Sequence, residues 1–127
     1  MRFIAGICGL IGLLTLADTA FAAGGKVDVK KGREASQQHC SRCHVIGDFN
    51  RNGGISSTPS FQLLVNALDD YQERFDTFYA RPPHPAVIII EGIKKRDELP
   101  HNAAPVKLTA KDVENIAAFA ETLKKKK

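Results

Sequence analysis

The stretch Cys40-Ser41-Arg42-Cys43-His44 decides most of what this sequence says about fold and function. It is a C-x-x-C-H motif, and two thiols at this spacing followed directly by an imidazole are the pattern of covalent haem attachment. In that pattern the cysteines bind the two vinyl groups of the porphyrin, and the histidine supplies one axial ligand to the iron. We therefore predict one covalently attached haem c, held by Cys40, Cys43 and His44.

Two other kinds of site use a pair of cysteines at this spacing. A thioredoxin-like redox pair needs a βαβ context, which the residues around Cys40 do not predict. A structural zinc site needs four ligands, and the sequence contains no second C-x-x-C pair to complete one. Haem attachment therefore stands as the prediction.

The first residues of the chain predict export. Arg2 gives a basic start, an apolar run extends from Phe3 to Leu16, and Ala20-Phe21-Ala22 is a small-x-small cleavage site. This is the pattern of a secretory signal peptide. The apolar run is shorter than the ~20 residues that a membrane-spanning helix needs, although an uncleaved anchor helix is the alternative.

Cleavage near Ala22 and Ala23 leaves residues 23–127 as one domain of ordinary size. Cys8 lies inside the signal peptide of residues 1–22, so the domain keeps only the two cysteines of the motif. We expect a periplasmic protein with no integral membrane span after cleavage.

The chain is basic, with 18 Lys and Arg against 14 Asp and Glu among its 127 residues, a net charge of +4. Part of the excess is the tail of residues 124–127, and lysines suit the negative end of a helix dipole. The alternative is attraction toward a partner whose surface is acidic, or toward an anionic lipid surface. The basic residues are not interleaved with aromatic ones, so we expect no nucleic-acid partner.

The capping and hydrophobic patterns predict a mostly helical chain. Asp28 is placed to cap a first helix, and Thr109 opens a last helix with a sequence that resembles a capping box. The helical segments expected are 28–40, 61–66, 69–79 and the segment from Thr109 to Leu123, whose apolar stripe is Val113, Ile116, Ala117, Ala120 and Leu123. Residues 45–60 read as a loop, and Val87–Ile90 as a strand or a buried extended loop.

The order of these features resembles a small monohaem cytochrome c of the class I fold. Besides the motif, the resemblance is carried by Thr58-Pro59-Ser60-Phe61, Pro83-His84-Pro85 and Leu108-Thr109 before a terminal helix that contains Phe119. It covers all of residues 23–127. It implies an all-α fold in which roughly three to five helices wrap around one covalently bound haem.

The same resemblance implies two contacts. The N-terminal and C-terminal helices should cross closely, with Gly32 leaving room for Phe119. The carbonyl of Pro59 should accept a hydrogen bond from the His44 imidazole, which would fix the ring and raise its basicity.

The chain departs from that family on the far side of the iron, where class I cytochromes usually place a methionine. Its single methionine is Met1, and Val87 stands where the family's methionine would be. His101 is our first candidate for the distal axial ligand and His84 the next, while His39 adjoins Cys40 on the proximal side. An open or water-bound iron is another alternative, and Asn102, Lys94 and Lys95 are weaker candidates.

The distal ligand decides the function. Two histidine ligands favour electron transfer and a lower potential than His/Met ligation, because axial methionine raises the potential. We therefore expect a single-haem electron-transfer protein that binds redox partner proteins transiently, over a small area. A five-coordinate iron would instead bind nitric oxide, carbon monoxide or peroxide, as in gas binding or sensing, and a haem subunit of a larger oxidoreductase is a third alternative. No catalytic carboxylate pair, nucleophile–base pair or phosphate loop stands out, so we do not expect an enzyme.

Overall fold

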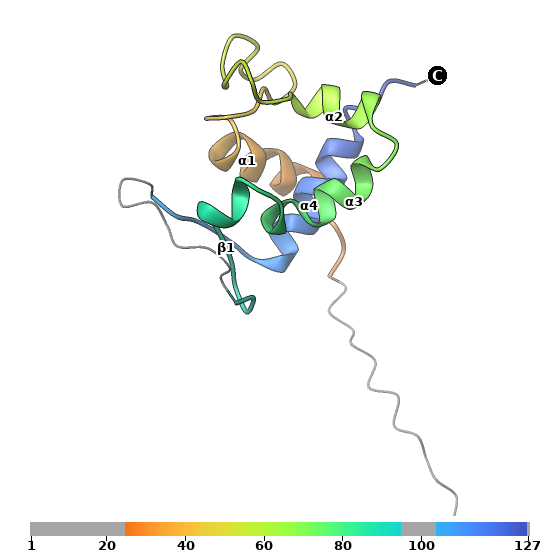
Figure 1. Cartoon of the computed structure of the whole chain (residues 1–127). Coiled ribbons are helices and arrows are strands. Elements are labelled where there is room, and N and C mark those ends of the chain that lie inside the picture. The colour runs from red at the N-terminus through yellow and green to blue at the C-terminus, as the bar shows by residue number, and fades with distance from the viewer. Residues whose placement is uncertain (1–24, 95–103, 127) are drawn as a thin grey trace, which may run out of the picture.

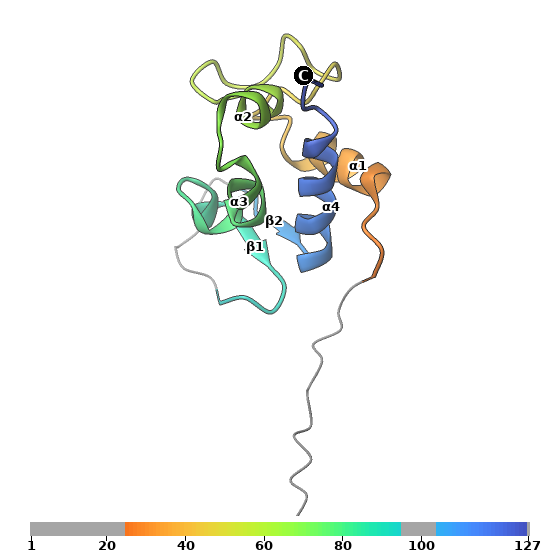
Figure 2. The same cartoon turned by 90° about the vertical axis from the view of Figure 1, so that its right-hand side faces the viewer.

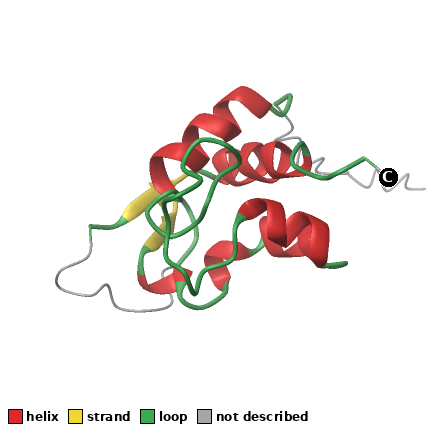
Figure 3. Ribbon diagram, turned by 90° about the horizontal axis from the view of Figure 1, so that it is seen from above, coloured by secondary structure: helices red, strands yellow, loops and turns green. Residues whose placement is uncertain are grey.

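The computed structural model describes residues 25–94 and 104–126. These residues are mostly helical, as expected, and they also form a small two-stranded sheet that the all-α expectation did not include (Figures 1 and 3). The α-helices are α1 (Val29–His39), α2 (Phe61–Ala67), α3 (Tyr71–Asp76) and α4 (Ala110–Glu121). Two 3₁₀ turns, η1 (Phe78–Ala80) and η2 (His84–Ala86), and two strands, β1 (Ile88–Ile90) and β2 (Val106–Leu108), lie between α3 and α4.

Helices α1 and α4 cross at Gly32, as the resemblance implied (Figure 2). A Cβ atom on Gly32 would lie 1.8 Å from the carbonyl oxygen of Asn115, so the crossing requires a residue without a side chain. The neighbour nearest to Gly32 is thus the backbone of Asn115 and not Phe119, whose ring instead lies 5.5 Å from the guanidinium carbon of Arg33. The Asn115 side chain also accepts a 2.8 Å hydrogen bond from the backbone N–H of Asp28.

Both long helices begin at the expected capping residues. The Asp28 carboxylate accepts hydrogen bonds from the backbone N–H groups of Lys30 and Lys31, which have no partner within the helix. The Thr109 hydroxyl accepts one from the N–H of Asp112, and the Asp112 carboxylate accepts one from the N–H of Thr109, so the capping box is confirmed.

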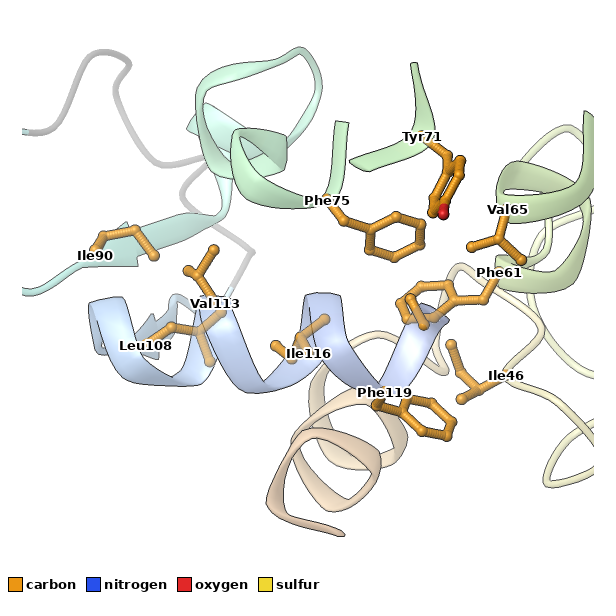
Figure 4. Close-up of a cluster of buried hydrophobic side chains, with 11 residues drawn as sticks. Ile46, Phe61, Val65, Tyr71, Phe75, Ile90, Leu108, Val113, Ile116 and Phe119 are labelled. Carbon is orange, nitrogen blue, oxygen red and sulfur yellow. The ribbon is translucent and has the colours of Figure 1, made fainter. Parts of the chain in front are cut away.

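The hydrophobic core lies between α4 and the two shorter helices (Figure 4). Ile116 of α4 is 1 % exposed, and the rings of Phe61 and Phe75 pack edge to face with their centroids 5.0 Å apart. The apolar stripe predicted for the last helix supplies much of this core, with Val113, Ile116 and Ala120 buried and Ala117 and Leu123 partly buried. Burial of this apolar area is the main favourable contribution to folding.

The strands β1 and β2 are parallel, with Ile88 opposite Val106 and Ile90 opposite Leu108. The pattern of the Val87–Ile90 run alone allowed a strand or an extended loop. In the structure Ile88–Ile90 of this run form a strand. Ile90 and Leu108 are buried, so the pair closes one end of the core. Leu108 directly precedes the cap of α4, and the sheet is therefore anchored to that helix.

The helix predicted over residues 69–79 is shorter in the structure. It is helical as α3 over Tyr71–Asp76, and the chain then tightens into the η1 turn. The hydroxyl of Thr77 donates to the carbonyl of Glu73, which marks the end of the helix. Across residues 25–94 and 104–126, none of the helices is long and apolar enough to cross a membrane.

Candidate functional site

The C-x-x-C-H motif forms a tight turn at the C-terminal end of α1. Cys40 is the first residue after the helix, and its carbonyl accepts hydrogen bonds from the N–H groups of Cys43 and His44, at 3.1 and 2.9 Å. Cys40 is partly buried and Cys43 is exposed. The turn therefore brings two thiols and one imidazole to the same short stretch of surface.

The surroundings of Cys40 differ from those of a reactive redox cysteine. Burial raises the pKa of the Cys40 thiol to about 12, and the neighbouring Cys43 acts in the same direction. Redox-active cysteines instead have a lowered pKa, often because they lie at the N-terminal end of a helix. Cys40 lies at the opposite end, where the helix dipole disfavours a thiolate. The raised pKa therefore favours the protonated thiol at Cys40.

The imidazole of His44 is held from two sides. Its Nδ1 lies 2.7 Å from the carbonyl oxygen of Pro59, the contact that the resemblance implied. The ring of Phe61 packs edge-on against it, with centroids 5.5 Å apart and planes at 66°. Because the carbonyl can only accept, Nδ1 carries the proton and the lone pair of a neutral ring lies on Nε2.

A side chain that the sequence did not single out, Asn50, ties the motif to the following loop. Its Oδ1 accepts from the backbone N–H of Ile46 at 2.7 Å, and its Nδ2 donates to the carbonyls of Ser41 and His44, both at 3.0 Å. Nothing in a Gly- and Asn-rich stretch distinguishes such a residue from an ordinary loop asparagine.

Gly54 brings the same loop back against the motif. Its φ is +79°, a conformation that favours glycine, and a Cβ atom there would lie 3.0 Å from the carbonyl oxygen of Cys43. The next residue, Ile55, donates its N–H to that carbonyl at 2.9 Å. The Gly53-Gly54 pair was the signal in the sequence, although it indicated only a turn.

The motif borders a cavity of about 450 Å³. Cys40, Cys43 and His44 lie on one side, and apolar side chains supply most of the remaining wall, among them Phe61, Phe75, Phe78, Val87 and Ile116. This volume is within the range of about 300–1,000 Å³ that is usual for cofactor sites.

His84 also lines this cavity and is the first residue of η2. Its Nδ1 lies 3.2 Å from the carbonyl oxygen of Arg81, and the ring of Phe78 packs edge-on against it, with centroids 5.6 Å apart. Burial lowers the pKa of His84, and the nearby His44 lowers it further, while the carbonyls of Arg81 and Phe78 act in the opposite direction. The neutral ring is therefore the favoured form.

The structure brings the rings of His44 and His84 close together at the site, with nearly parallel planes. Their ring centroids are 6.0 Å apart and their planes differ by 16°. His39, at the end of α1, and Val87 line the same cavity. His101, the first candidate for the distal ligand, lies outside the described residues.

Two arginines that the sequence did not single out also line the cavity. Arg74 donates from Nε to Asp70 at 2.8 Å, and Arg81 donates from Nη2 to Glu73, also at 2.8 Å. Arg81 also donates from Nε to the hydroxyl of Thr77 at 3.0 Å. Each guanidinium has five N–H donors, so both keep donors that could bind a further anionic group.

Comparison with known protein families, curated proteins and solved structures finds no match for this chain. The interpretation of the site therefore rests on its own residues. Of the side chains that the sequence selected, Cys40, Cys43, His44 and His84 lie around one cavity.

Proposed function

We propose that this protein is a periplasmic c-type cytochrome, a single-haem electron-transfer protein of the class I fold. The observation that carries the proposal is the setting of His44. The imidazole follows directly on Cys43, its Nδ1 is bound to the carbonyl of Pro59, and it borders a largely apolar cavity of about 450 Å³. The close crossing of α1 and α4 at Gly32 supports the class I assignment.

The residues around the cavity suit a porphyrin. A flat apolar ring would contact Phe75, Phe78 and Ile116, and two carboxylate substituents could pair with Arg74 and Arg81. Arginine binds carboxylates well because its planar fork of donors matches their geometry. The fit involves both the apolar and the charged parts of the site.

Cys40 and Cys43 would hold the cofactor covalently. The Sγ–H of each cysteine would add across one vinyl double bond, with sulfur bonding to the carbon next to the ring and the hydrogen going to the terminal carbon. The addition transfers no net electron and releases no leaving group. A thiol that stays protonated, which the raised pKa favours for Cys40, would supply that hydrogen directly.

When bound, haem supplies a one-electron ferric–ferrous couple. His44 would offer Nε2 as the proximal ligand, and the hydrogen bond of its Nδ1 to the carbonyl of Pro59 would fix the tautomer of the ring. The apolar side chains of the wall would limit contact between water and a bound haem. The exposed Cys43 and the half-exposed Ile55 beside it give a small surface for transient contact with redox partner proteins.

The test is covalent haem in the full-length chain, produced in a bacterial host that matures c-type cytochromes. We expect haem absorbance to remain with the polypeptide on a denaturing gel, and the intact mass to include one haem. The double variant Cys40→Ala/Cys43→Ala should lose both signals. Cys8→Ala, the third cysteine of the chain, should keep them.

Two results would contradict the proposal. One is a folded chain that carries no haem but retains a stoichiometric zinc ion. The other is a folded chain whose two motif cysteines cycle between dithiol and disulfide at the potential of a redox enzyme.

A further inference from the structure

We propose that His84 is the second axial ligand, so that the iron is held between His44 and His84. This inference rests on the proposed function, since it concerns the same cofactor. It replaces His101 as the leading candidate, because His84 is the residue that the described structure places opposite the proximal imidazole.

The spacing of the His44 and His84 rings suits two imidazoles that bind one metal ion. A metal–imidazole bond is about 2 Å long and a ring nitrogen lies about 1 Å from its ring centre, so two imidazoles on opposite sides of one ion have centroids about 6 Å apart. The His44 and His84 centroids are 6.0 Å apart. Rings packed face against face would instead approach to about 4 Å. The alternative is an offset-stacked pair of neutral rings, and the experiment must distinguish it from coordination of one iron by both rings.

The rings of His44 and His84 are held by the same two kinds of contact. Each imidazole has Nδ1 on a backbone carbonyl, Pro59 for His44 and Arg81 for His84. Each has a phenyl edge against its ring, Phe61 for His44 and Phe78 for His84. Histidines that bind metals almost always donate their second ring N–H to such a partner, because it fixes the ring and its tautomer.

Within residues 25–94 and 104–126, no hydrogen bond engages Nε2 of His44 or of His84. With Nδ1 protonated, Nε2 is the atom that offers a lone pair in both rings. The two lone pairs and the cavity that both rings border are what a six-coordinate iron needs from its protein ligands.

The turn that contains His84 is restricted in its conformation. Pro82, Pro83 and Pro85 flank the histidine, and its own N–H donates to the carbonyl of Arg81 at 3.0 Å. Prolines restrict the chain before the ligand binds, so less conformational entropy is lost on coordination. A ligand on such a turn also keeps its place when the iron changes oxidation state.

Val87, which stands where the related family has its methionine, cannot replace His84 as a ligand, because its side chain carries no donor atom. It lines the same cavity three residues further along the chain. The chain thus offers an aliphatic contact at the methionine position and an imidazole one 3₁₀ turn before it. Bis-histidine ligation would lower the potential relative to His/Met ligation.

The experiment uses the full-length holoprotein and its absorption spectrum, ferric and ferrous, with and without carbon monoxide. We expect low-spin bands that carbon monoxide does not shift. His84→Ala should become high-spin in the ferric form and bind one carbon monoxide per haem in the ferrous form, and added imidazole should restore the low-spin spectrum. His101→Ala and His39→Ala should retain the parent spectrum.

Electron paramagnetic resonance of the ferric protein gives a second readout. Axial rings whose planes differ by 16° predict a rhombic low-spin signal, whereas perpendicular rings give a highly anisotropic one. If His84→Ala fails to accumulate, His84→Met provides the variant that folds, because methionine can still coordinate. It should stay low-spin and have a higher reduction potential than the parent.

Several results would overturn the inference. A high-spin parent that binds carbon monoxide would indicate an open iron and favour gas binding. A loss of the low-spin spectrum in His101→Ala, with His84→Ala unchanged, would assign the ligand to His101. Both outcomes leave covalent haem in place on the denaturing gel, so they are distinct from failure of the proposed function itself.

Discussion

The two walls of the cavity hold their imidazoles alike but are built differently. We call residues 40–61 the His44 wall and residues 78–90 the His84 wall. The His44 wall is a long loop joined by side chains and by bonds across it, such as Asn50 to His44 and Phe61 N–H to the carbonyl of Val45. The His84 wall is a series of short turns, in which Arg81, His84 and Val87 each donate to the carbonyl three residues earlier.

The difference shows two ways to fix a ring. A long loop loses much conformational entropy on ordering, and a few specific side chains must offset that loss. A series of turns rich in proline is restricted already and needs no such residue. Single substitutions should therefore cost more on the His44 wall than on the His84 wall.

The largest effect is expected for Asn50→Ala in the His44 wall. The variant removes three hydrogen bonds and leaves the N–H of Ile46 and the carbonyls of Ser41 and His44 without that partner. We expect the free energy of unfolding of the holoprotein to fall by about 3 kcal/mol, measured by denaturant titration.

Asn66 is the matched control for Asn50, because it also makes three side-chain hydrogen bonds but is exposed. Asn66→Ala should lower the free energy of unfolding by less than about 1 kcal/mol, since water can replace the lost partners. Equal losses of unfolding free energy in the two variants would mean that the hydrogen bonds of Asn50 do not specifically stabilise the His44 wall.

Two glycines with the same φ angle allow the two walls to be compared. Gly54 lies in the His44 wall and Gly92 just beyond the His84 wall, and both have a φ of +79°. A Cβ atom at Gly54 would lie 3.0 Å from the carbonyl oxygen of Cys43, whereas a Cβ atom at Gly92 would meet none of the described residues within 4 Å. Gly54→Ala should cost about 2–3 kcal/mol of unfolding free energy and Gly92→Ala about 1 kcal/mol.

The unfolding free energies of the two glycine variants are compared by denaturant titration, from their midpoints at equal slope of free energy against denaturant concentration. If Gly92→Ala proves as costly as Gly54→Ala, the positive φ alone sets the cost. The packing of Gly54 against the motif would then contribute nothing.

The smallest effect is expected for Ser60→Ala at the end of the His44 wall. The Ser60 hydroxyl accepts the N–H of Leu63 at 3.0 Å and so caps α2. Loss of such a cap costs about 1 kcal/mol. Ser60→Asp should restore the stability, since aspartate caps equally well. A thermal melt of the three proteins checks both, and an unrescued loss would point to packing of the serine instead.

The sequence predicted the parts of the molecule whose signal is local. The Asp28 cap and the capping box of Thr109 each depend on residues a few positions apart. The crossing at Gly32 and the Pro59 contact followed from the resemblance, although the partner of Gly32 is Asn115 and not Phe119.

The other features depend on residues that are distant in the chain. A histidine among prolines is typical of a turn, so the sequence favours His101 over His84. The 6.0 Å separation between the His84 and His44 rings has no local signal in the sequence. The strand Ile88–Ile90 needed its partner, Val106–Leu108, before its conformation was decided. Asn50 is one of several polar residues in its loop, and only its three hydrogen bonds distinguish it.

The crossing of α1 and α4 also has a consequence for the order of events during folding. The N–H of Asp28 and the side chain of Asn115 that accepts it are 87 residues apart in sequence. Contacts of such long range form late, and a chain made from its N-terminus cannot complete this one until nearly all of it exists. Cys40 and Cys43, next to α1, would stay accessible throughout that interval. If the chain binds haem as proposed, late packing of α4 would leave time for haem to reach the two cysteines before the protein packs around it.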